Sequence, residues 1–145
     1  MSGADHRADL PGEDNARRWL GHAERDSLAA KACLEADQSV PEVSAYLCQQ
    51  ATEKLVKALL VLANIPFPKT HDIEALRDLV AAAFPELISL IDPLIYVTEW
   101  AVVFRYPDLT EDIPPSAEEI RVVLQKIERL ASRIRCLLGS EPSTR

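Results

Sequence analysis

Three parts of the chain carry side chains that could transfer a proton or bind an anion. His71 has an imidazole, the side chain that can act as an acid or a base near neutral pH. Arg105 offers a guanidinium for an anion, and Tyr106 beside it offers a ring on which a base can stack. Lys57 adds a further cation. These four residues are the candidates for a nucleotide or RNA cleft.

Each of these candidates also has a purely structural interpretation. His71 lies between Thr70 and Asp72, two residue types that cap helices, so its imidazole could simply bond a backbone group or Asp72. Arg105 could satisfy the last carbonyl groups of a helix that ends there, with Tyr106 packed beside it. The sequence leaves both interpretations open.

A second polar cluster is expected on one side of the helix predicted over residues 39–63. A face that is only hydrated does not usually carry apolar side chains such as Val56 among its polar ones. We therefore predict a dimer or partner interface, with a wet cleft, a phosphate site and a charged face with local ion pairs as alternatives. The predicted interface residues are Tyr46, Gln49, Gln50, Glu53, Lys57 and Leu60.

The sequence favours neither a metal site nor a bound cofactor. Cys33, Cys48 and Cys136 lie far apart and form no CxxC pair, so we expect free thiols in a reducing compartment. Cys48 has no histidine near it in sequence and is interpreted as a structural thiol. No spacing of His, Cys, Asp and Glu suits a metal, and no glycine loop suits a phosphate.

The composition indicates one helical domain. The 145 residues include 48% hydrophobic side chains and only 4 glycines, which suffices for one core and favours helices. The formal charge of −7 argues against general nucleic-acid binding, because phosphate neutralisation needs surplus Lys and Arg. The first residues do not resemble a signal peptide, and the apolar runs are far shorter than the roughly 18 residues of a membrane span. We expect a cytoplasmic protein that does not enter a membrane.

Hydrophobic residues recur at steps of three and four over most of the chain, which is the pattern of amphipathic helices. The stretches with this periodicity are residues 15–36, 39–63, 70–84, 86–91, 92–105 and 116–138. The second and the last of them begin with the spacing of a capping box, Ser39 with Glu42 and Ser116 with Glu119.

These stretches predict an all-α domain over residues 15–139, folded as an antiparallel up-and-down bundle of four long helices plus one short helix, with residues 86–91 as a short piece between helices. Residues 1–14 mix charge, Gly and Pro without periodicity and are predicted to be a disordered tail, as are residues 140–145. The predicted core stripe of the 39–63 helix consists of Ala51, Leu55, Ala58, Leu59 and Leu62.

Three motifs follow one another along this predicted bundle. They are QQATEKLVKALL at residues 49–60, KTHDI at residues 69–73 and RYPD at residues 105–108. In order and spacing they resemble the HEPN domain family, over roughly residues 15–138. The resemblance implies a helical bundle that often dimerises. It also implies, for many members, a small nucleotidyltransferase encoded beside them as a partner, in toxin–antitoxin-like systems.

The resemblance further implies two kinds of activity. Some members are metal-independent ribonucleases, and others are noncatalytic nucleotide-binding or interaction modules. The ribonuclease members carry an Arg, then four to six residues, then a His. Arg105 matches that Arg, but Thr110, Glu111 and Asp112 occupy the places of the His. Without an imidazole there, no group of near-neutral pKa activates the ribose 2′-hydroxyl or protonates the leaving oxygen.

The prediction is therefore a non-catalytic interaction module. It would form a homodimer and partner a nucleotidyltransferase, with a nucleotide as a second candidate ligand. The alternative is a metal-independent ribonuclease toxin that uses Arg105, Tyr106 and His71.

Overall fold

The computed structural model describes the backbone of residues 11–105 and 115–139, and the side chains of residues 12–101 and 115–139. The predicted tails up to residue 10 and from residue 140, and the loop that contains Tyr106, lie outside this part of the chain. The elements are α2 (Pro11–Glu35), α3 (Pro41–Leu62), α4 (Ile73–Ala83), η1 (Pro85–Leu87), α5 (Ile88–Ile91), η2 (Asp92–Val97), α6 (Thr98–Arg105) and α7 (Ala117–Leu137). All of them are helical, so the all-α prediction is confirmed.

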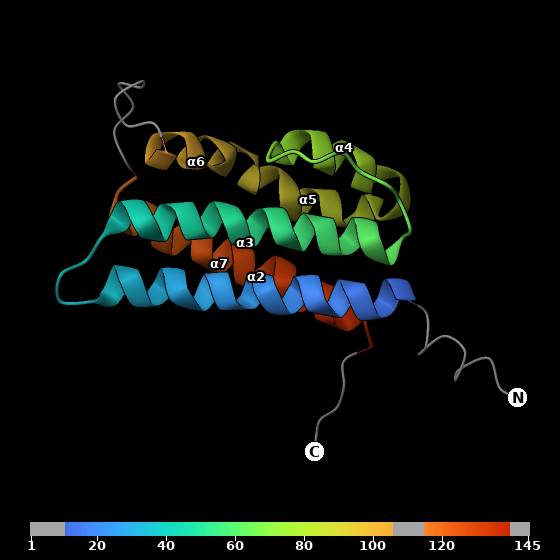
Figure 1. The fold of residues 1–145 in the computed structure, drawn as a ribbon, viewed down its shortest axis with the longest axis horizontal. Helices are drawn as coiled ribbons and strands as arrows, with labels where there is room; N and C mark the ends of the chain where they lie inside the picture. The colour runs from blue at the N-terminus through green and yellow to red at the C-terminus, as the bar shows by residue number, and fades with distance from the viewer. Residues whose placement is uncertain (1–10, 106–114, 140–145) are drawn as a thin grey trace, which may run out of the picture.

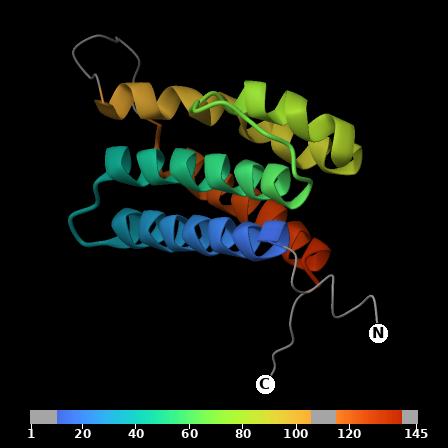
Figure 2. The ribbon, with the colours of Figure 1, turned by 45° about the vertical axis from the view of Figure 1, so that its right-hand side comes forward.

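The long helices α2 and α3 run antiparallel, side by side, and α7 crosses behind them (Figure 1). The shorter elements α4, α5 and α6 lie on the opposite side of α3 from α2, an arrangement that the turned view also shows (Figure 2). The helix α3 therefore lies in the middle of the bundle and packs against α2, α4, α6 and α7.

The central position of α3 explains why so much of it is buried. Its predicted core residues Ala51, Leu55, Ala58 and Leu59 are inaccessible to solvent, while Leu62 near its end is half-buried. The facing helices contribute apolar side chains, mostly Leu, Ile and Val, to the same core. The largest fully buried ones outside α3 are Ile73, Leu76, Leu87, Ile91, Leu94, Ile120, Ile127, Leu130 and Ile134.

Two predicted helix starts need correction. The helix α2 begins at Pro11 rather than near residue 15, because proline suits the first turn and Glu13 and Asp14 favour the positive end of the helix dipole. The predicted capping box at the start of α3 does not form. Val40 occupies the N-cap position without a side-chain hydrogen bond, and Ser39 precedes it.

Two other predicted caps are confirmed. Asp72 caps α4, because its Oδ1 accepts hydrogen bonds from the backbone N–H groups of Glu74 (3.0 Å) and Ala75 (3.4 Å). Ser116 caps α7, because its Oγ accepts from the backbone N–H of Glu119 at 3.1 Å.

The helix predicted over residues 92–105 is divided into η2 and α6. Asp92 does not cap it. Instead, its Oδ1 accepts a hydrogen bond from Arg77 Nε at 2.7 Å, which joins this segment to α4. Thr98, the first residue of α6, accepts from the backbone N–H of Ile73 at 3.2 Å. These two bonds hold the short elements together over α3.

Candidate functional site

A polar network lies inside the bundle, on the side of α3 that the sequence had marked as unusual. Gln49, Glu53 and Lys57 are spaced by four residues, so they lie one above the other on one face of the helix. They are 0%, 5% and 9% exposed, respectively. The network is therefore enclosed by the folded chain itself.

Glu53 is the centre of this network. Its Oε2 accepts a hydrogen bond from Lys57 Nζ at 2.6 Å, and its Oε1 accepts one from Gln49 Nε2 at 2.9 Å. His71 Nδ1 lies 2.9 Å from the same Oε1. Gln50 extends the chain of bonds by donating from Nε2 to Gln49 Oε1 at 2.6 Å.

The surroundings of Glu53 act on its pKa in opposite directions. Burial raises the pKa, but the hydrogen bonds from Lys57, His71 and Gln49, together with the charge of Lys57, outweigh burial and leave the pKa lowered. Glu53 is therefore a carboxylate at neutral pH. An ionised carboxylate only accepts hydrogen bonds, so Nδ1 of His71 carries the proton that joins the two groups.

Lys57 directs its charge into the protein. Besides Glu53, its Nζ lies 5.7 Å from the centre of the Trp19 ring and 5.8 Å from that of Phe67, distances at which a cation is attracted to an aromatic face. Trp19 comes from α2 and Phe67 from the loop after α3. The ammonium group therefore joins α3, α2 and the loop after α3, and its charge is used in contacts within the fold.

His71 stands at the edge of the network and is reached by solvent. Its side chain is 55% exposed, whereas that of Glu53 is 6% exposed. The loop that carries His71 is fixed by the Asp72 cap and by Thr70, whose Oγ1 accepts from the backbone N–H of Asp72 at 3.1 Å. The structural interpretation of His71 predicted that its imidazole bonds a backbone group or Asp72. Its Nδ1 instead bonds Glu53.

The structure brings together two of the four residues predicted for a nucleotide or RNA cleft. His71 and Lys57 meet through Glu53. Arg105 ends α6, and its side chain, like the whole of Tyr106, lies outside the described residues. The membership of these four residues in a ligand site stays a prediction.

The predicted interface on α3 is largely covered. Leu60 is 0% exposed, and Gln49 and Glu53 are enclosed as described above, so these three side chains are buried within the single chain and their place in an interface stays a prediction. Trp19 of α2 and the loop residues Phe67 and His71 lie against Lys57 and Glu53 on this face. Tyr46 and Gln50 are half-buried, and their place in an interface stays a prediction.

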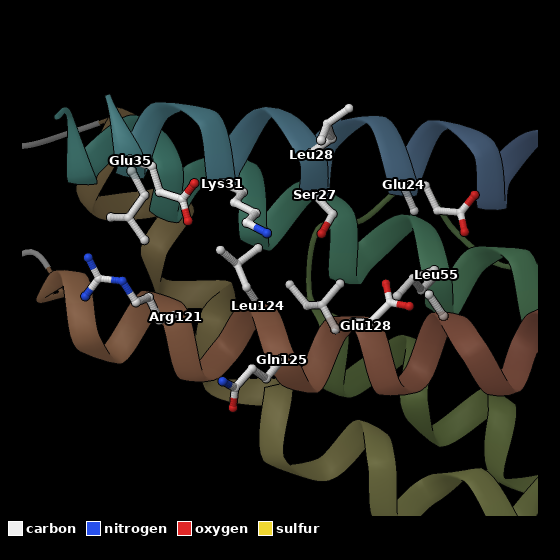
Figure 3. Close-up of a pocket in the computed structure, with 14 residues that line it drawn as sticks. Glu24, Ser27, Leu28, Lys31, Glu35, Leu55, Arg121, Leu124, Gln125 and Glu128 are labelled. Carbon is white, nitrogen blue, oxygen red and sulfur yellow. The ribbon is translucent and has the colours of Figure 1, made fainter. Parts of the chain in front are cut away.

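An open groove lies elsewhere, between α2 and α7 (Figure 3). It has a volume of about 670 Å³. Its apolar lining comes from both flanking helices and from α3, whose Leu55 lies at the bottom, and its borders are charged. The lining residues include Glu24, Ser27, Leu28, Lys31, Glu35, Leu55, Arg121 and Glu128.

The sequence analysis missed this groove, although one signal pointed to it. Leu28 lies off the core stripe of α2 and is 70% exposed, the highest exposure among the large hydrophobic residues described. A large apolar side chain outside the stripe is a sign of an interaction surface when other apolar atoms lie beside it. The neighbouring apolar atoms come from α7, which the sequence does not place next to α2.

The Cys48 thiol is not a candidate nucleophile, and the described residues contain no metal-binding cluster. Cys48 is fully buried, and burial raises the pKa of its thiol to about 12, so it stays protonated and unreactive. No group of three or more His, Cys, Asp and Glu side chains within residues 12–101 and 115–139 is placed to hold a metal ion.

In the same part of the chain, none of the helices has the length and apolar character needed to span a bilayer.

Comparison with known proteins yields one match. The family model described as the HEPN domain matches residues 16–137, which covers α3, its polar network and both helices of the groove. No curated protein and no solved structure matches the chain.

Proposed function

Because the chain belongs to the HEPN domain family, we propose that it is a non-catalytic interaction module. It forms a homodimer and partners a small nucleotidyltransferase, and a nucleotide is a second candidate ligand. The observation that carries this proposal is the closed network around Glu53. Lys57 and His71, the side chains expected to hold a phosphate or move a proton, both bond to this one carboxylate.

The sequence after α6 supports the same proposal. A ribonuclease of this family would need a histidine four to six residues beyond Arg105, and Thr110, Glu111 and Asp112 stand there. Uncharged or acidic side chains at these places offer no imidazole for proton transfer near neutral pH. An interaction role needs no such group.

Co-expression with a small nucleotidyltransferase tests the proposal. We expect one complex to elute at a mass above that of either protein alone. If the two proteins elute separately at micromolar concentration, the proposed partner is wrong.

A ribonuclease is the second candidate, and one observation favours it. His71 is oriented by a buried carboxylate through Nδ1, which leaves Nε2 unprotonated in the neutral imidazole, and its ring is more than half exposed. A histidine oriented in this way is a recognised form of general base.

Incubation of the purified protein with RNA in the presence of a chelator distinguishes the two candidates. The interaction module leaves the RNA intact. Cleavage that is lost in both His71→Ala and Arg105→Ala would instead establish the ribonuclease. Cleavage that survives both changes would come from a contaminant and would support neither role for these residues.

A further inference from the structure

We infer that residues 66–71, in the loop between α3 and α4, form a strap that opens over the Glu53–Lys57 pair while the helices stay folded. The strap is the light-green loop that leads into α4 in Figure 2. The inference names the regulation of the polar network. It deepens the proposed function, and it rests on that function only for the anionic ligand that would enter.

The strap covers the pair with two side chains. The centre of the Phe67 ring lies 5.8 Å from Lys57 Nζ, and His71 Nδ1 lies 2.9 Å from Glu53 Oε1. Trp19, which lies on the other side of the ammonium group, belongs to α2. Because both covering side chains come from the same short loop, a movement of this loop alone uncovers the carboxylate and the ammonium group.

The strap itself is loosely attached. All of residues 66–71 are exposed or half-buried, and Phe67 is the one of them that packs against the hydrophobic core. Pro66 and Pro68 have no backbone N–H group with which to hold the strap to the bundle. A segment with few buried apolar contacts and a solvent-reached polar bond is of the kind that opens locally, well below the free energy of global unfolding.

The helices on either side of the strap are ended by their own hydrogen bonds. At the end of α3, the backbone N–H groups of Asn64 and Ile65 donate to the carbonyl groups of Val61 (3.1 Å) and Leu60 (2.9 Å). Asn64 adopts the left-handed conformation that this motif requires, with φ 59°. At the start of α4, the Asp72 side chain caps the first turn. Neither end depends on the strap, so the strap can move without unwinding α3 or α4.

The surface beneath the strap is charged, which lowers the free energy needed to expose it. Removing a carboxylate and an ammonium group from water is unfavourable, and their mutual attraction offsets only part of that desolvation. When the strap opens, water returns to Glu53 and Lys57. Opening over a purely apolar surface would bring no such compensation.

Opening changes what Lys57 can bind. In the closed strap its ammonium group is covered by Phe67 and bonded to Glu53 at 2.6 Å. In the open strap it would face water beside the ring of Trp19. A cation next to an aromatic ring can bind a phosphate and stack a base, so the strap controls access of the nucleotide named in the proposed function.

Chemical labelling of lysine amines, read by mass spectrometry, tests the inference on the intact protein. Lys54 is an internal reference, because it lies on the same helix and is also paired at 2.6 Å, with Asp26. Its side chain is 27% exposed, against 11% for Lys57. We expect Lys57 to be labelled about 10-fold more slowly than Lys54, through local opening.

The dependence of this labelling on urea separates local from global opening. Below the unfolding transition, the rate at Lys57 should hardly change with urea, because moving six residues exposes little new surface. A rate that rises with urea as steeply as the equilibrium constant for global unfolding would overturn the inference.

Phe67→Ala removes the ring of the strap, and Phe84→Ala is the matched control. Phe84 is likewise half-buried against the core, but it lies at the end of α4, away from Lys57. Phe67→Ala should raise the labelling of Lys57 relative to Lys54 by about 10-fold, whereas Phe84→Ala should leave the ratio unchanged. Equal ratios in the two variants would overturn the inference. His71→Ala, a change at an exposed residue that leaves the core intact, should raise the ratio too.

Labelling in the presence of millimolar ATP separates the inference from the proposed function. If the nucleotide enters under the strap, ATP should slow the labelling of Lys57 in Phe67→Ala and leave Lys54 unaffected. Urea-independent labelling without any protection by ATP would support the strap and remove the nucleotide from the proposed function. Protection by ATP together with labelling that follows global unfolding would overturn the strap and leave the nucleotide in place.

Discussion

At the scale of single residues, Glu53 connects more of the molecule than any other polar side chain described above. It joins α3 to itself through Gln49 and Lys57, and to the loop before α4 through His71. A buried ion pair does not by itself stabilise a protein, because desolvation offsets much of the attraction. Removing one partner is costly, however, because the remaining charge is left buried. Glu53 and Lys57 are therefore best tested together.

Glu53→Gln should lower the free energy of unfolding by roughly 3 kcal/mol, because it leaves the Lys57 ammonium buried without its counter-charge. Adding Lys57→Met should recover most of this loss. Chemical denaturation measures both. The matched control is Lys54→Met, which breaks the more exposed Lys54–Asp26 pair at 2.6 Å and should cost no more than about 1 kcal/mol. Equal losses in Glu53→Gln and in this control would contradict the central role of Glu53.

The lowered pKa of Glu53 also predicts how stability depends on pH. Its contribution is fully present above the ordinary glutamate value of 4.5 and is lost as the pH falls through the lowered pKa of the folded state. In that window the unfolded chain binds the proton more readily, so stability rises with pH. Unfolding free energies measured from about pH 3 to pH 7 should show a wild-type advantage over Glu53→Gln that shrinks on acidification. A difference that is constant over this range would show that Glu53 is not titrating.

At the scale of elements, the caps decide where the helices begin and where the site residues lie. Asp72 fixes the first turn of α4 and, with Thr70, the loop that brings His71 to Glu53. Ser116 fixes the start of α7, which forms one wall of the groove. The helix α3 has no such cap, and its start depends on Pro41 and on packing.

Asp72→Ala should therefore cost about 1 kcal/mol of stability, because two backbone N–H groups at the start of α4 lose their acceptor. Ser39→Ala, a change of similar size before α3, should have no measurable effect, since Val40 occupies the N-cap position there. Thermal unfolding of the two variants compares them directly. If Ser39→Ala lowers stability as much as Asp72→Ala does, the capping box that the sequence indicated forms at the start of α3 after all.

At the scale of the whole molecule, the position of α3 in the middle of the bundle decides which surfaces remain open. Trp19 of α2 and the loop between α3 and α4 lie against the side of α3 that carries the polar network. The opposite side of the bundle is less completely closed, and α2 and α7 leave a groove of about 670 Å³ between them. Among the described residues, the groove thus lies at α2 and α7 rather than on the face of α3 that carries the polar network.

This arrangement predicts different consequences for two leucines. Leu60→Asp should lower the free energy of unfolding by more than about 4 kcal/mol, because it places an unpaired carboxylate where exposure is 0%. Leu28→Asp should change stability by less than about 1 kcal/mol, since Leu28 is mostly exposed in the monomer. Denaturation at a concentration where both proteins are monomeric measures the two effects. Similar stabilities would show that α3 is not enclosed as described.

The sequence by itself determined the features that depend on near neighbours in the chain. Helical periodicity gave the all-α class and the inward residues Leu55 and Leu59, and local hydrogen bonding gave the caps at Asp72 and Ser116. The spacing of Gln49, Glu53 and Lys57 also placed them on one face without any tertiary information. These inferences hold because a helix fixes the relation between residues three and four apart.

Only the tertiary structure decided what that face contacts. The bond between His71 and Glu53 depends on how the loop before α4 returns to α3, and the burial of Leu60 depends on the elements that pack around α3. The groove requires α2 and α7, from opposite ends of the chain, to lie side by side. Helical periodicity shows which side of a helix is apolar and which is polar. Whether a side is buried depends on the elements that pack against it, and that packing is determined by the core as a whole.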